Sequence, residues 1–98
     1  MDKSINLDQE SFNREEKAIF HGSDPEILKC IQTLACFINH EGGKFLVKEV
    51  KKKEFLKSFF DAVTLENKLN SYLEPPISGI ISVSSYNHKK GVKIIIKK

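Results

Sequence analysis

The feature that most constrains the fold is an apolar segment carrying both the start and the stop signals of a long helix. Its apolar residues recur at helical spacing and form a broad stripe: Ile27, Leu28, Cys30, Ile31, Leu34, Ala35, Phe37 and Ile38. Residues 23–26 read Ser-Asp-Pro-Glu, which combines capping residues, a first-turn proline and a capping-box glutamate. Gly42 or Gly43 then supplies the left-handed residue that ends a helix. The breadth of the stripe predicts a central helix buried on most of its sides.

Short strands and short helices are predicted around this helix. Residues 16–20 alternate weakly, as a short strand does, and residues 44–50 form a second strand after the glycines. A helix then presents an inner face made of Phe55, Leu56, Phe59, Phe60 and Val63. Thr64 is the expected N-cap of a further helix, which Pro75 and Pro76 stop and whose apolar residues are Leu65, Leu69, Tyr72 and Leu73.

The last part of the chain predicts a β-hairpin, with strands at residues 80–86 and 92–97 around a turn at 87–91. Apolar residues alternate with Lys93 and Lys97, so we expect one buried sheet face and one largely basic face. The whole pattern predicts an α+β fold, a mixed or antiparallel sheet with a central buried helix and two shorter helices.

Length and composition set the class of protein. A chain of 98 residues has room for one modest core, which we place at residues 14–98. Residues 1–13 are polar, and we expect a flexible N-terminal segment in which Ile5 and Leu7 could add an edge strand. No apolar stretch is long enough to span a membrane and the N-terminus lacks a signal-peptide core, so a cytoplasmic location is expected. Cys30 and Cys36 lie on different helix faces and are expected to be small buried thiols.

Charge is distributed unevenly along the chain. Residues 1–43 carry four basic and eight acidic side chains, whereas residues 44–98 carry twelve basic and five acidic ones. A polyanion would be drawn to the second half with a strong dependence on salt. The alternative is that these lysines only keep a small domain soluble.

Several familiar chemistries do not fit the sequence. Gly42-Gly43-Lys44 lacks the spacing of a phosphate-binding loop, and its glycines end a helix where such a loop would begin one. The histidines stand in three separate turns and neither cysteine has metal-ligand spacing, which argues against structural zinc. Glu10, Glu15 and Glu41 could converge on a divalent cation for phosphodiester hydrolysis, although acidic residues near a surface strand are usually only solvated.

Lysines stand at exposed places from which they could reach phosphates. Lys51, Lys52 and Lys53 lie where a strand meets a helix, and Lys89 and Lys90 lie at the tip of the hairpin. Tyr72 and Tyr86 could stack on unpaired bases. The plainer interpretation, which we favour, puts Tyr72 in the core and makes Tyr86 the end of a strand.

Two motifs resemble the AlbA-like domain of the Schlafen family. That domain opens with Glu-Ser-x-x-x-Glu-Phe-Lys, which is matched by residues 10–17, and its central helix ends in Ala-Phe-Ala-Asn-x-x-Gly-Gly, which is matched by residues 36–43. A short helix closing on Ile-x-Pro is comparable to residues 73–76, and a terminal hairpin follows. The resemblance covers nearly the whole chain.

The resemblance implies binding of DNA or RNA, and in some members a metal-dependent RNA endonuclease using Mg²⁺ or Mn²⁺. Glu10 and Glu15 would then be catalytic metal ligands, and Lys17 would join the lysines that bind nucleic acid. The family strand continues Gly-Val-x-Asp, whereas residues 48–51 read Lys-Glu-Val-Lys. A lysine near the expected third carboxylate would compete with the metal, so we expect binding more than cleavage.

The leading hypothesis is therefore a nucleic-acid-binding module that contacts the phosphate backbone through lysines. The alternatives are a metal-dependent endonuclease acting on tRNA-like substrates and a degenerate accessory subunit that completes a partner nuclease. A homodimer, or a hetero-oligomer with another Schlafen-like chain, is a further expectation from the resemblance.

Overall fold

The fold is described from a computed structural model, for residues 14–72 and 79–97. The strands are β1 (Arg14–Phe20), β2 (Gly43–Val50), β3 (Ile81–Tyr86) and β4 (Gly91–Ile96). The helices are α2 (Asp24–Asn39), α3 (Lys53–Lys57) and α4 (Ala62–Asn70). The strands form one four-stranded sheet in the order β1-β2-β4-β3, in which only the β1–β2 pair is parallel. The predicted α+β class with a mixed sheet and three helices is confirmed. The expectations for residues 1–13 and for Pro75 and Pro76 lie outside the described residues.

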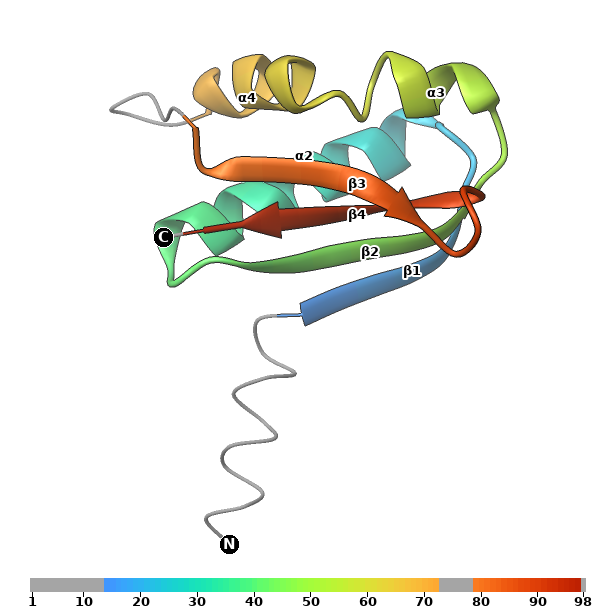
Figure 1. Ribbon diagram of the computed structural model, residues 1–98. Coiled ribbons are helices and arrows are strands. Elements are labelled where there is room, and N and C mark those ends of the chain that lie inside the picture. Colours follow the sequence, from blue (N-terminus) through green and yellow to red (C-terminus); the bar gives the residue numbers. More distant parts are fainter. Residues whose placement is uncertain (1–13, 73–78, 98) are drawn as a thin grey trace, which may run out of the picture.

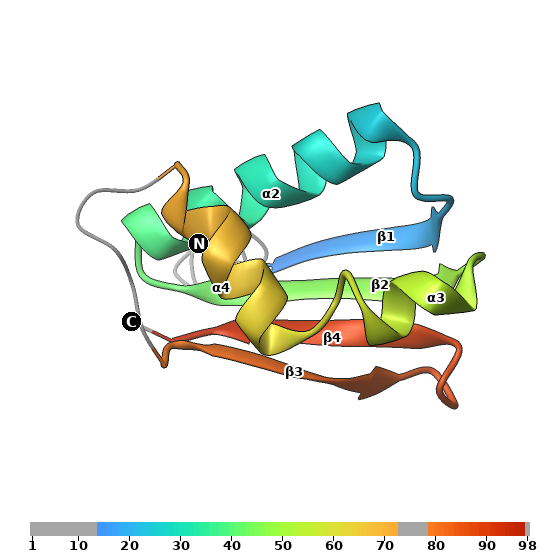
Figure 2. The ribbon, with the colours of Figure 1, turned by 90° about the horizontal axis from the view of Figure 1, so that it is seen from above.

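A single hydrophobic core lies between the sheet and the helices, which cover one side of the sheet (Figures 1 and 2). Its fully buried side chains come from every layer and include Phe20, Leu34, Val47, Phe60, Leu65, Leu69 and Ile94. Phe20 joins strand to helix, because its ring lies 5.2–6.0 Å from the rings of Phe55, Phe59 and Phe60. Burial of this apolar surface is the main term that stabilises the two layers.

Helix α2 begins and ends where the sequence predicts. The Glu26 carboxylate accepts hydrogen bonds from the N–H groups of Ser23 and His21, both at 3.1 Å. Gly42 has φ of +90° and donates its N–H to the carbonyl of Phe37, which stops the helix. The expectation that α2 is buried on most sides is wrong. Leu28 is 46% exposed and Cys36 is also exposed, because none of the described elements covers the outer face of α2.

The two helices after β2 begin and end at other residues than the sequence predicts. Helix α3 ends at Lys57, a turn carries Phe59 and Phe60 into the core, and α4 begins after Asp61. The carboxylate of Asp61, and not Thr64, caps α4 by accepting from the N–H groups of residues 63 and 64. Val63 lies in the first turn of the restarted helix and is 63% exposed, and Tyr72 follows the end of α4 and is 56% exposed, so neither lies in the core as predicted.

A β-bulge in β2 shapes one end of the sheet. Val47 pairs with Val92, whereas Val50 donates its N–H to the carbonyl of Lys90, so β2 contains one residue more than β4 over this stretch. Because of the extra residue, Val47 and Val50 both face the core. Gly91 lies opposite the bulge, where a Cβ atom would meet the carbonyl oxygen of Val47 at 1.8 Å.

We expect Gly91→Ala to lower the free energy of unfolding by about 2 kcal/mol or more, since the clash is with backbone that cannot move aside. Urea denaturation measures this change. Ser85→Ala, at an exposed position of the neighbouring strand, is the matched control and is expected to change stability by less than about 0.5 kcal/mol. Equal stability of Gly91→Ala and the control would contradict the bulge geometry.

Glu26 gives the fold a dependence on pH. Partial desolvation raises its pKa, but the hydrogen bonds from Ser23 and His21 and the nearby Lys17 outweigh it and lower the pKa to about 2. Because the pKa is lower in the folded state, the stabilisation is present above the unfolded-state pKa of about 4.5 and is lost as pH falls towards 2.

We therefore expect Glu26→Gln to destabilise the fold at pH 7 by on the order of 1–2 kcal/mol. The difference from the unchanged chain should shrink between about pH 4.5 and pH 2, as measured by urea denaturation across that range. Glu41→Gln, at an exposed position after α2, serves as the control. A stability difference that does not vary with pH would contradict this role of the carboxylate.

Candidate nucleic-acid interface

The side of the sheet that faces away from the helices is the open face. Strand alternation and register place ten side chains on it: Arg14 and Glu16 from β1, Lys44, Leu46 and Lys48 from β2, Lys93 and Ile95 from β4, and Ser82, Ser84 and Tyr86 from β3. None of the helices in the described ranges packs on this face. The expected basic face is seen only in part, because four of these ten side chains are basic and Glu16, Leu46 and Ile95 lie among them.

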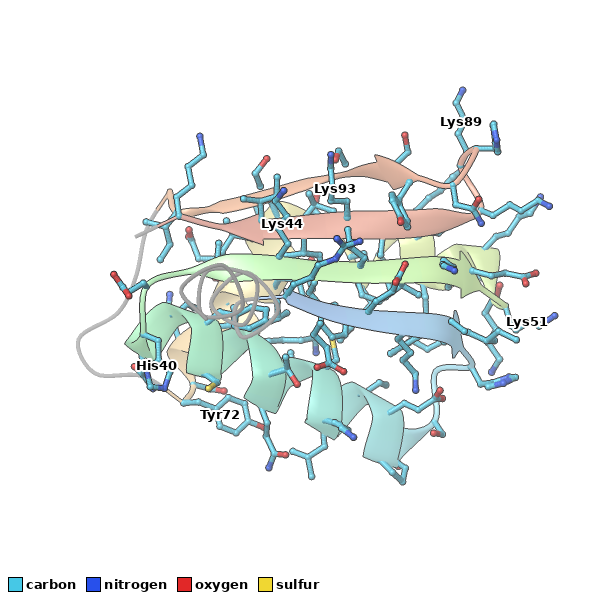
Figure 3. All side chains as sticks on the ribbon, turned by 90° about the horizontal axis from the view of Figure 1, so that it is seen from below. His40, Lys44, Lys51, Tyr72, Lys89 and Lys93 are labelled. Carbon is cyan, nitrogen blue, oxygen red and sulfur yellow. The ribbon has the colours of Figure 1, made fainter. Side chains whose placement is uncertain are left out.

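Cationic side chains lie close together on the open face. Lys44 pairs in register with Arg14, and Lys93 pairs with Leu46, so these cations occupy three adjacent strands. Figure 3 views the sheet from below and shows Lys44 and Lys93 on the near side. No carboxylate of the described residues lies within ion-pair distance of Lys44, Lys48 or Lys93. Within the described part of the chain, no ion pair neutralises these three charges.

A second group of cations lies at the end of the sheet where β2 finishes. The β3–β4 hairpin holds Lys90 beside β2 through its carbonyl, which accepts from Val50, and the side-chain amide of Asn87 donates to the carbonyl of Lys48 at 2.8 Å. Figure 3 shows Lys51 and Lys89 at this same end. Lys51 and Lys89, about 40 residues apart in sequence, thus lie at one end of the sheet. They lie at its two sides, Lys89 at the β3–β4 hairpin and Lys51 near β1.

The hairpin turn has an uncommon backbone. Asn87, His88 and Lys89 have φ of 54°, 57° and 68°, the left-handed region, and none of them is glycine. Each such residue costs about 1–2 kcal/mol, with asparagine at the low end. Strained turns of this kind persist where surrounding contacts fix them, and they concentrate at functional sites. Here the contacts are the Asn87 amide and the N–H of Lys90, which donates to the carbonyl of residue 87.

Two of the predicted lysines are directed away from the open face. The Lys17 ammonium lies 3.4 Å from the Glu26 carboxylate, on the side of β1 that faces α2. The Lys52 ammonium lies 6.0 Å from the centre of the Phe55 ring, against the helix layer. Lys51 lies 3.6 Å from the Glu49 carboxylate but keeps about half of its side chain exposed.

Tyr86 does more than end a strand. Its hydroxyl donates to the Glu16 carboxylate at 3.3 Å, although β3 and β1 are opposite edges of the sheet with β4 and β2 between them. The side chain must therefore lie across the open face instead of standing upright from it. This contact between residues 70 apart in sequence was not expected.

The predicted carboxylate site is described only in part. Glu10 lies outside the described residues. Glu15 lines a groove of about 420 Å³ between β1 and α2, together with Lys17 and Glu26. Glu41 is exposed in the loop after α2. The described residues contain no group of three or more His, Cys, Asp or Glu that could hold a metal ion. Metal ligation by Glu10 and Glu15 with Mg²⁺ or Mn²⁺ therefore stays a prediction.

The two cysteines differ in environment. Cys30 is buried in the core, and burial raises the pKa of its thiol to about 12, although Lys17 opposes the shift. Cys36 is exposed, so the expectation of two buried thiols is wrong for this residue. The thiolate is the reactive form of cysteine, and burial both shields Cys30 and disfavours its thiolate. Of the two cysteines, only Cys36 is therefore accessible to reagents in the folded state.

We expect one of the two thiols to react quickly with a disulfide reagent such as Ellman's reagent at pH 8, and the second only at the rate of unfolding. Absorbance of the released thiolate measures both phases. Cys36→Ser should remove the fast phase and Cys30→Ser should leave it. Two fast thiols in the folded protein would contradict the burial of Cys30.

Sequence reasoning missed part of the cationic face. It identified Lys93 from the alternation of the last strand, but not Arg14, Lys44 or Lys48, since their side depends on the order of the strands. A signal was present in the second strand, where Lys44, Leu46 and Lys48 alternate with Phe45 and Val47.

Comparison with known proteins identifies no relative: no family model, no curated protein and no solved structure matches the chain. Within the described ranges, none of the helices has the length and apolar character needed to cross a bilayer.

Proposed function

We propose that this chain is a nucleic-acid-binding module that holds the phosphate backbone on the open face of its sheet. The observation that carries the proposal is the group of cations on adjacent strands, Arg14, Lys44, Lys48 and Lys93, without a carboxylate partner among the described residues. Lysine and arginine on a flat surface reach phosphates without reading bases. The contacts would position a strand and not select its sequence.

The carboxylates near these cations are engaged in local contacts, which supports the proposal. Glu16 accepts a hydrogen bond from Tyr86, and Glu49 lies beside Lys51. The formal net charge of the chain is only +3, so long-range attraction is modest and local arrangement has to supply the affinity. The lysines at the end of the sheet, Lys51, Lys89 and Lys90, would extend the path of the backbone beyond the open face.

The proposal also rests on the resemblance of residues 10–17 and 36–43 to the Schlafen AlbA-like domain, which implies nucleic-acid binding. We propose that the chain belongs to this family. Lys17 then has a structural role beside Glu26, in place of the expected contact with nucleic acid.

A charge-matched pair of variants tests the proposal. Lys44→Gln, Lys48→Gln and Lys93→Gln together remove three charges from the open face. Lys29→Gln, Lys57→Gln and Lys68→Gln remove the same number from the helix layer. We expect the first variant to weaken binding to unrelated DNA and RNA oligonucleotides alike, and to reduce the slope of log affinity against log salt by about 2–3.

The helix-layer variant should keep the affinity and most of the salt slope, as fluorescence anisotropy at several salt concentrations would show. A further variant, Lys51→Gln, Lys89→Gln and Lys90→Gln, measures how much the lysines at the end of the sheet contribute to the affinity. Equal losses in the open-face and helix-layer variants would mean that only net charge matters, and the open face would not be the interface.

A further inference from the structure

We infer that the nucleic acid bound on the open face is single-stranded, and that Tyr86 stacks on one of its bases. This inference rests on the proposed function and adds the class of nucleic acid. It depends on the position of one side chain. The Tyr86 hydroxyl reaches Glu16 on the far edge strand, so the ring extends over the middle strands among the cations of the open face.

A tyrosine side chain that crosses a face carrying lysines suits a base and a phosphate at the same time. Tyr86 is only partly buried, and it pairs in register with Gly91, which has no side chain to rise beside the ring. Ring stacking on a base is worth about 5-fold to 150-fold in affinity and tolerates any base, because every base has a π-face. Lys93 lies on β4 and Lys48 on β2, the two middle strands that the Tyr86 side chain crosses, where the phosphates on either side of that base would pass.

A duplex would use this surface poorly. Its bases are stacked inside, and the outside offers phosphates and groove edges, so a tyrosine lying across a sheet meets no base face. The centre of the open face also holds Ile95, which is apolar and partly exposed and offers nothing to a phosphate, whereas Leu46 beside it is only 4% exposed. A single strand can place unstacked bases over this centre and keep its backbone on the surrounding lysines.

The chain contains its own control for this inference. It has two tyrosines and no tryptophan, and the other tyrosine, Tyr72, is 56% exposed and lies beside α2 and α4, away from the open face. Figure 3 shows Tyr72 near α2, well separated from Lys44 and Lys93. Tyr72→Ala therefore removes an exposed ring of the same kind from the helix layer.

The experiment compares a dye-labelled oligo(dT) and oligo(U) of about 12 nucleotides, within the usual site size, with duplexes of the same length. We expect the single strands to bind at least about 10-fold more tightly than the duplexes. Tyr86→Ala should weaken single-strand binding by roughly 5- to 150-fold, Tyr86→Phe by less than about 3-fold, and Tyr72→Ala by no more than Tyr86→Phe.

Intrinsic fluorescence gives an independent readout. In Tyr72→Phe the emission comes from Tyr86 alone, and stacking should quench it when unlabelled oligo(U) saturates the protein. Duplex binding that equals or exceeds single-strand binding, or unquenched Tyr86 emission at saturation, would overturn this inference and leave the proposed function intact. Absence of binding to every oligonucleotide would overturn both.

Discussion

The structure depends on one constraint: a single layer of helices packs on one side of a single sheet, so there is one core and the strands turn most of their apolar side chains towards it. Val92, Ile94 and Ile96 are buried for this reason, and the residues between them lie on the side of the sheet that faces away from the helices. The lysines of the open face are thus the solvated half of the same pattern that builds the core. Leu46, which lies on the open face and is only 4% exposed, is an exception. Shifting the register of β4 by one residue would turn Lys93 towards Phe45 and Val47, which makes the placement of the cations as firm as the core itself.

The bulge beside Gly91 links the core to the end of the sheet where lysines gather. The extra residue in β2 turns Val50 inward, and its N–H then holds the hairpin through the carbonyl of Lys90. The same end of β2 supplies the carbonyl of Lys48, which accepts from the Asn87 side chain. These contacts offset the cost of three left-handed residues in the turn, so the positions of Lys89 and Lys90 are set by the backbone of a neighbouring strand.

Local signals predicted the local structure, and contacts distant in sequence did not follow from them. Residues 23–26 and Gly42 mark the bounds of α2 because caps and left-handed glycines act within a few residues. The helices after β2 were predicted with the wrong bounds, since adjacent Phe59 and Phe60 both enter the core through a turn and Asp61 restarts the helix. On the open face, alternation predicted that β4 carries basic residues. Which cations of other strands lie beside Lys93, and which residue the Tyr86 side chain contacts, depend on strand order, and no local pattern encodes that order.

This chain has nearly as many acidic as basic residues, and it still presents a cationic surface. Three of its described carboxylates help to build the fold: Glu26 holds the start of α2, Asp61 caps α4, and Glu66 accepts from the N–H of Gly79. Each of these lies in the helix layer or at its ends. A carboxylate that fixes a backbone cannot also neutralise a lysine on the other side of the sheet, because the core separates them. The division of labour between the two layers therefore separates the charges, and the open face is cationic although the whole chain is close to neutral.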